Sequence, residues 1–218
     1  NNGEDFTART ERVDKHIALN DSDIIYVGYG INAPEYQWND YAGIDVKDKT
    51  VIMLVNDPGF ATQDEKIFTG NAMTYYGRWT YKYEEAARQG AKAVFIVHQT
   101  APAAYPWSVV ESSNTGSKYT LVDDHNNADK LPIMGWIQHD VAQQIFKSAG
   151  LDFAEQEKQA LNKTFKAQSL NLKANLTLNI EIEKAVSNNV VATLKGTTQA
   201  DEYIVIGAHY DHLGFGGK

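Results

Sequence analysis

The stretch Trp79–Val97, WTYKYEEAARQGAKAVFIV, predicts the centre of the fold. Apolar side chains recur in its first half at spacings of three and four, which predicts a helix with one buried face. That face is made by Trp79, Tyr83, Ala86 and Ala87, with Tyr76 just before them. Gly90 suits the left-handed position that ends a helix. Ala93–Val97 is then an unbroken apolar run, which is typical of a strand buried on both faces.

Similar patterns flank this stretch on both sides. The expected strands are Ile24–Val27, Thr50–Val55 and Pro132–Ile137, and a helical face follows over Val141–Ala149. Strand, helix and strand in this order favour a right-handed βαβ crossover. We therefore expect a compact α/β unit over residues 21 to 155, after a polar lead-in of irregular or weakly helical structure over residues 1 to 20. Residues 99 to 130 are rich in turn-forming residues and predict a long surface loop or hairpin.

The pattern changes after residue 155. Apolar and polar residues alternate without interruption from Leu170 to Ile182, which predicts a strand with one buried face. Two further strands are expected at Asn189–Leu194 and Tyr203–Ile206. We interpret residues 156 to 218 as the opening of a second sheet, so the predicted fold class is mixed α/β (α+β) with two domains.

Composition excludes several classes of protein. Of 218 residues, 43% are hydrophobic and 22% are charged, as in an ordinary globular protein. The net charge of −8 argues against a nucleic-acid partner, and no apolar run is long enough for a membrane span. The chain has no cysteine, which excludes disulfides and cysteine nucleophiles. It begins with Asn1 rather than Met, so we expect that a natural start has been removed.

Two weaker signals favour structural roles. Gly28–Ala33 has the loose form of a dinucleotide-binding loop, but no apolar helical face follows it, so we expect a plain turn and no cofactor-binding residues. The histidines outside the last ten residues have no partners at ligand spacing and are predicted to be surface or structural residues. They are His16, His98, His125 and His139.

The last predicted strand leads into a cluster of metal-ligating side chains, His209, Asp211 and His212. In open α/β sheets the carboxyl ends of strands are the usual ligand-binding edge. The spacing between His209 and Asp211 lets the carboxylate reach the imidazole, fix its tautomer and make its other nitrogen a better metal ligand. A structural His–Asp pair at a strand end is the alternative on spacing alone.

The sequence around this cluster adds a family resemblance. NVVATLKG (Asn189–Gly196) and EYIVIGAHYDHLG (Glu202–Gly214) closely resemble the start of the catalytic domain of M28-family zinc aminopeptidases. The resemblance implies two zinc ions, a set of five ligands and a glutamate general base. It makes His209 a zinc ligand and Asp211 the residue that orients it, while His212 receives no role. The other ligands have no matching position here, so we expect a fragment or processed chain of a longer enzyme, inactive alone and without stoichiometric zinc.

The earlier unit looks like the protease-associated (PA) domain inserted in many of these enzymes. The resemblance rests on Tyr26–Gly30, Lys49–Val55 and the order of elements from Glu84 to Val97. It implies that this domain lies over the active-site cleft and limits which substrates enter. Within the aromatic stretch from Tyr75 to Tyr81, the candidate substrate-binding residues are Tyr76, Arg78 and Trp79.

The resemblance therefore implies a metallo-aminopeptidase that hydrolyses N-terminal peptide bonds of a peptide substrate. The family's habit of export, together with the missing Met, implies a periplasmic or extracellular location. Two other functions stay open. One is a non-catalytic PA-like module that binds peptides or proteins, and the other is a peptidase-like receptor domain that has lost its metal.

Overall fold

The computed structural model describes residues 1–209 of the chain. The chain divides into two units, which we call the sheet unit (residues 1–182) and the C-terminal segment (from Glu183 onward). All helices and strands of the described residues lie in the sheet unit. No helix in the described part of the chain is long and apolar enough to cross a membrane.

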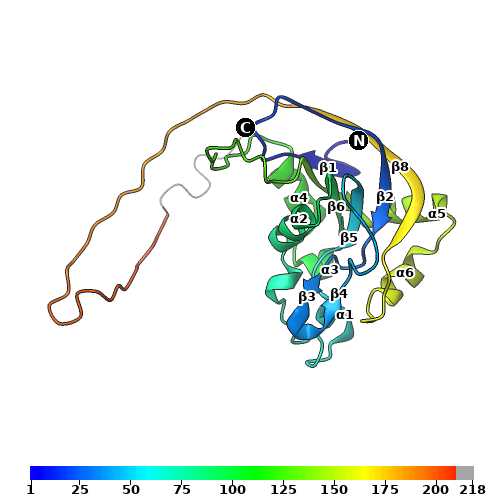
Figure 1. Ribbon diagram of the computed structural model, residues 1–218, viewed down its shortest axis with the longest axis horizontal. Helices are drawn as coiled ribbons and strands as arrows, with labels where there is room; N and C mark the ends of the chain where they lie inside the picture. The colour runs from blue at the N-terminus through cyan, green and yellow to red at the C-terminus, as the bar shows by residue number, and fades with distance from the viewer. Residues whose placement is uncertain (210–218) are drawn as a thin grey trace. The chain divides into compact units, whose positions relative to one another are not determined.

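A mixed six-stranded sheet forms the centre of the sheet unit, in the order β1-β7-β6-β5-β2-β8 (Figure 1). The four inner strands run parallel to one another, and each edge strand pairs antiparallel with its neighbour. The six strands are β1 (Phe6–Arg9), β2 (His16–Tyr26), β5 (Thr50–Leu54), β6 (Ala93–His98), β7 (Ile133–Gln138) and β8 (Gln168–Asn179). A separate short hairpin pairs β3 (Asn32–Ala33) with β4 (Trp38–Asn39).

Helices cover both faces of this sheet (Figure 1). The α-helices are α1 (Pro58–Thr62), α2 (Trp79–Arg88), α3 (Thr100–Ala103), α4 (Trp107–Asn114), α5 (His139–Ser148) and α6 (Phe153–Gln159), and the 3-10 helices are η1 (Pro34–Tyr36) and η2 (Tyr75–Gly77). Along β5, Val51 and Met53 pack with residues of α2 and α4, whereas Ile52 and Leu54 pack with residues of α5 and α6. A strand covered on both faces needs apolar residues at every position, which explains the unbroken run.

The predicted β-α-β order is confirmed, because β5 and β6 are parallel neighbours with α2 between them in the chain. Gly90 has φ +80°, the left-handed conformation expected after the helix. The predicted buried face of α2 is only partly right, since Trp79 is 41% exposed. Lys82 and Glu85 are buried instead, because the loop around β3 also covers the helix.

Two segments expected to be irregular are ordered. The lead-in forms β1 and the start of β2, so the prediction for residues 1 to 20 is wrong. Backbone pairing of β1 with β7, and of β2 with β8, holds this segment whatever the polarity of its side chains. The predicted loop over residues 99 to 130 contains α3 and α4.

The alternating segment forms the predicted strand, β8, but it joins the first sheet. It pairs antiparallel with β2, where Leu176 lies opposite Leu19 and Leu178 lies opposite Ile17. The first compact unit therefore runs to Ile182, beyond the boundary expected near residue 155.

The two strands predicted at Asn189–Leu194 and Tyr203–Ile206 do not form. A strand exists only when another strand accepts its backbone hydrogen bonds, and no described residue pairs with either segment. Their apolar side chains lie in solvent, with Leu194 100% exposed and Ile204 94% exposed. The described residues of the C-terminal segment therefore hold no second sheet.

Candidate functional site

The predicted metal ligand His209 is an exposed residue of the C-terminal segment. Asp211 and His212 lie outside the described residues, so the predicted orientation of the imidazole by Asp211 stays a prediction. An imidazole is a suitable zinc ligand, but a zinc site needs about three protein ligands. Within residues 1–209 no group of three or more His, Asp or Glu side chains could hold a metal ion. The described residues alone therefore do not fit a zinc site.

The predicted substrate-binding residues lie in three different environments. Tyr76 packs in an aromatic cluster, 6.0 Å from the ring of Phe68 and 5.0 Å from that of Tyr81. Its hydroxyl donates to the Glu35 carboxylate, which raises the pKa of Tyr76 to about 12. Arg78 precedes the first residue of α2 and is exposed. The role of these residues in substrate binding stays a prediction.

Trp79, the third of these residues, lines a pocket that we call the Trp79 pocket. Its cavity volume is about 430 Å³, within the range of small-ligand sites. Its lining comes from the end of β1 and the two residues after it, the start of α2, the loop before α4, α4 itself, the loop after α4, and β7: Arg9, Thr10, Glu11, Trp79, Tyr105, Val109, Val110, Ser113, Asn114, Lys118, Tyr119, Thr120 and Trp136. No short sequence pattern predicts such a site, because its walls come from segments far apart in the sequence.

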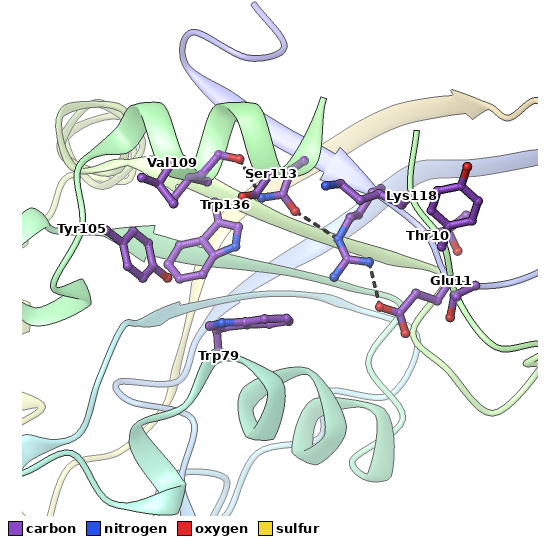
Figure 2. Close-up of a pocket in the computed structure, with 13 residues that line it drawn as sticks. Thr10, Glu11, Trp79, Tyr105, Val109, Ser113, Lys118 and Trp136 are labelled. Carbon is purple, nitrogen blue, oxygen red and sulfur yellow. Dashed lines mark hydrogen bonds and ion pairs between the residues drawn. The ribbon is translucent and has the colours of Figure 1, made fainter. Parts of the chain in front are cut away.

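Figure 2 shows that the pocket has an aromatic end and a charged end. Trp79 and Trp136 lie on opposite sides, with Tyr105 at one end and Glu11 and Lys118 at the other. Trp136 is only 3% exposed, and its ring centroid lies 6.4 Å from that of Tyr105. The aromatic end is therefore anchored in the core of the sheet unit.

His98 packs against both aromatic residues of this end, Tyr105 and Trp136. It is 5% exposed, its ring packs 6.2 Å from Trp136, and its Nε2 lies 3.0 Å from the Tyr105 carbonyl oxygen. Burial lowers the pKa of His98, which favours the neutral ring. This packing agrees with the structural role predicted for His98.

One buried lysine of α2, which the sequence analysis missed, does not line the Trp79 pocket. Lys82 is 0% exposed, and its Nζ donates to the Tyr29 carbonyl oxygen at 2.6 Å and to the Tyr76 carbonyl oxygen at 3.5 Å. Burial lowers the pKa of Lys82 to about 7, although Asp40 and Asp57 partly oppose the shift. The lysine ties η2 to the turn after β2, which is a structural role.

The two carboxylates near Lys82 are also buried. Asp40 accepts hydrogen bonds from the Ile31 backbone N–H at 3.0 Å and from the Trp38 indole at 2.8 Å. Burial nevertheless raises the pKa of Asp40 to about 7. Asp57 caps α1 and accepts bonds from the Thr74 N–H and hydroxyl. These hydrogen bonds position the loops around α2.

Comparison with known proteins bears on the C-terminal segment. Residues 189–217 match the sequence profile of peptidase family M28. These residues are an M28 peptidase segment. The match includes His209 and both strings that carried the resemblance in the sequence. The predicted family is thereby confirmed for this part of the chain, whereas the PA-like assignment of the sheet unit stays a prediction.

One solved structure similar to this chain is described as "Aminopeptidase from Aneurinibacillus sp. strain AM-1". The identity is 19% and the TM-score 0.33, over 79% of this chain and 29% of that one. This chain therefore spans less than a third of the length of that protein. No curated protein matches the sequence. The M28 assignment accordingly rests on the segment 189–217.

Proposed function

We propose that this chain is part of an M28 aminopeptidase that removes N-terminal residues from peptides in a zinc-dependent reaction. The match of residues 189–217 to peptidase family M28 carries the proposal. Within that segment His209 is the proposed zinc ligand, and Asp211 is the proposed positioning residue for its imidazole. We also propose that the enzyme acts in the periplasm or outside the cell, which cell fractionation can test.

The direct test uses the full-length enzyme that contains this chain. His209→Ala should abolish most of the zinc content and lower hydrolysis of leucine p-nitroanilide by at least about 100-fold, because removing a metal ligand costs at least as much as removing the group that hydrogen-bonds to it. Asp211→Asn should lower zinc affinity by about 10- to 100-fold. Elemental analysis and the rate of anilide hydrolysis measure the two effects separately.

His125→Ala is the matched control, since His125 is an exposed histidine of the sheet unit outside the M28 segment. It should leave both zinc content and hydrolysis unchanged. Full zinc content and activity in His209→Ala would refute the proposed ligand.

For the 218 residues alone we expect neither anilide hydrolysis nor stoichiometric zinc. A catalytic zinc needs about three protein ligands, and the family resemblance assigns only His209 within this sequence. Tight binding of one or two zinc ions per chain would overturn this expectation.

The sheet unit is proposed to act as a PA-like domain that limits substrate access to the peptidase. Arg78 is the residue proposed to face the substrate, supported by its exposure beside the aromatic cluster. Arg78→Ala in the full-length enzyme should change relative kcat/KM values across a peptide panel. Unchanged ratios across the panel would remove Arg78 from the proposal.

A second candidate function is peptide binding by the sheet unit without catalysis. The Trp79 pocket favours it, because an exposed tryptophan at the mouth of an aromatic cavity is typical of a recognition site. This function does not depend on zinc. Binding measurements with peptides that cannot be hydrolysed separate it from the peptidase function.

A further inference from the structure

We infer that the Trp79 pocket binds a peptide segment in which an aromatic side chain neighbours an acidic one. The inference deepens the second candidate function and rests on it. Each part of the ligand follows from a different part of the pocket.

The aromatic end accounts for the aromatic side chain. Trp136 and Tyr105 are held against each other and against His98, so this wall is formed before a ligand arrives. Trp79 faces it across the cavity (Figure 2). A flat ring between these walls gains contact on both faces, and aromatic pairs add about 0.5–1.5 kcal/mol beyond the area that they bury.

The charged end accounts for the acidic side chain. The Arg9 guanidinium is already engaged, with Nη1 donating to the Glu11 carboxylate at 2.7 Å and Nε donating to the Asn114 side-chain oxygen at 3.0 Å. Lys118 is exposed and has no ion pair within the described residues. Two cations thus face one carboxylate, which leaves a surplus of one positive charge in a chain of net charge −8. A carboxylate on the ligand is the group that this surplus attracts.

The shape of the surface favours a chain-like ligand. A second pocket, of about 530 Å³, also has Glu11 and Trp79 in its lining, so the two cavities adjoin at these residues. The second pocket is lined by charges of both signs, including Glu84, Arg88 and Lys130. Such a surface suits the polar backbone and side chains of an extended peptide better than a compact apolar molecule.

Exposed apolar residues at the mouth support a binding surface here. Trp79 and Val109 are each 41% exposed, and Tyr119, which also lines the pocket, is 94% exposed. Leu121, two residues after Tyr119 in the chain, is 95% exposed. Apolar residues gathered at one place on a surface mark an interaction site more often than scattered ones do.

The test uses the 218-residue chain and four acetylated, amidated tetrapeptides, Ala-Phe-Asp-Ala, Ala-Phe-Lys-Ala, Ala-Ala-Asp-Ala and Ala-Phe-Ala-Ala. Acetylation removes the free amino terminus, so an aminopeptidase cannot consume the probes. Isothermal titration calorimetry should give the tightest binding for the Phe-Asp peptide. Replacing Asp by Lys, or Phe by Ala, should weaken binding at least about fivefold, and raising the salt concentration should reduce only the preference for Asp.

Two substitutions locate the site. Trp79→Ala should weaken binding of the Phe-Asp peptide at least about tenfold, because hot-spot tryptophans have effects of this size. Lys118→Glu should reverse the preference between the Asp and Lys peptides without affecting the fold, since the Lys118 side chain is exposed. Lys147→Glu is the matched control, because Lys147 is an exposed lysine of α5 without an ion pair in the described residues. It should leave all four affinities unchanged.

The outcomes separate the two levels of the proposal. If none of the four peptides binds, both the peptide-binding function and the inferred ligand are wrong. If all four bind equally, or if Lys118→Glu and Lys147→Glu behave alike, peptide binding stands and the assignment of an aromatic-acidic ligand to this pocket fails.

Discussion

The two apolar runs Ala93–Val97 and Tyr203–Ile206 have similar sequences and opposite structures. The first is β6, in which Ile96 and Val97 are each 0% exposed. The second forms no strand, and Ile204 is 94% exposed. An apolar run of the same kind therefore specifies a buried strand in one region and an exposed segment in the other.

The difference lies in the partners. β6 hydrogen-bonds with β5 on one side and β7 on the other, and helices cover both of its faces. In the described residues no strand pairs with Tyr203–Ile206. Burial stabilises a strand by roughly 25 cal/mol for each Å² of apolar surface removed from water, so a run without partners gains nothing by becoming extended.

Removing the same side chain from each run gives the largest expected difference. Ile96→Ala should lower the free energy of unfolding by about 2–5 kcal/mol, since it leaves a cavity in the core. Ile204→Ala should change it by less than about 0.5 kcal/mol, as expected for a surface position. Urea denaturation followed by tryptophan fluorescence measures both. Equal destabilisation by the two changes would show that the Ile204 side chain is buried in solution, and the contrast between the two runs would be wrong.

A buried lysine of the sheet unit and an exposed lysine of the C-terminal segment should differ in how they make the free energy of unfolding depend on pH. Lys82 has a folded-state pKa of about 7 against a usual 10.5, so the unfolded chain holds this proton more tightly. Stability should therefore rise with pH between about 7 and 10.5, by on the order of 5 kcal/mol, and Lys82→Met should remove the rise. Lys184→Met, which changes an exposed lysine of the C-terminal segment, is the control and should keep it.

Asp40 is expected to change the pH dependence of stability in the opposite direction. Its pKa rises from 3.8 to about 7 on folding, so the folded protein holds this proton more tightly and stability should fall with pH between these values. Asp40→Asn should flatten this fall. Urea titrations from pH 4 to pH 10 measure both windows. A profile unchanged by either substitution would contradict the assigned pKa shifts.

Glycines provide a third, smaller contrast. A Cβ added at Gly135 in β7 would lie 2.2 Å from the Thr7 carbonyl oxygen and 2.7 Å from Cε1 of Phe95, so the strands would have to shift. Gly135→Ala should cost about 1–3 kcal/mol of stability. Gly207→Ala, in the C-terminal segment, meets nothing within 4 Å and should change stability by less than about 0.5 kcal/mol. Thermal unfolding of the two variants tests this, and a stable Gly135→Ala would mean that β1 and β7 separate easily.

The sequence predicted the inner part of the fold because local pattern and burial agree there. β5, β6, α2 and α5 follow from unbroken runs and helical spacing, which reflect what each segment packs against. The edge strand β1 was missed because its stability comes from backbone pairing with β7, 125 to 131 residues later in the chain, and leaves little trace in its side chains. The strands predicted in the C-terminal segment were wrong for the reverse reason, since pattern alone supplies no partner.

The candidate sites also differ in whether local sequence or the fold brings their residues together. His209 was found because its ligand chemistry lies in one short motif that a family profile also matches. Lys82 was missed because its burial depends on the Tyr29 carbonyl, 53 residues earlier in the chain. The Trp79 pocket was anticipated only through Trp79 itself, since Arg9, Tyr105 and Trp136 are brought to it by the fold.

The smallest contrast concerns one aspartate in each region. Asp152 accepts a hydrogen bond from the Glu155 backbone N–H at 3.2 Å and caps α6. Phe153 of this helix is part of the hydrophobic core of the sheet unit. Asp152→Ala should lower the free energy of unfolding by about 1 kcal/mol, as for other helix caps. Asp201→Ala, in the C-terminal segment, removes an exposed carboxylate beside a turn and should have no measurable effect. If urea denaturation shows equal losses, the aspartate at 201 stabilises a structure in solution, and the C-terminal segment would have to be regarded as folded. If only Asp152→Ala is destabilising, a residue type contributes to stability only where the surrounding chain supplies its partner, as with the two apolar runs.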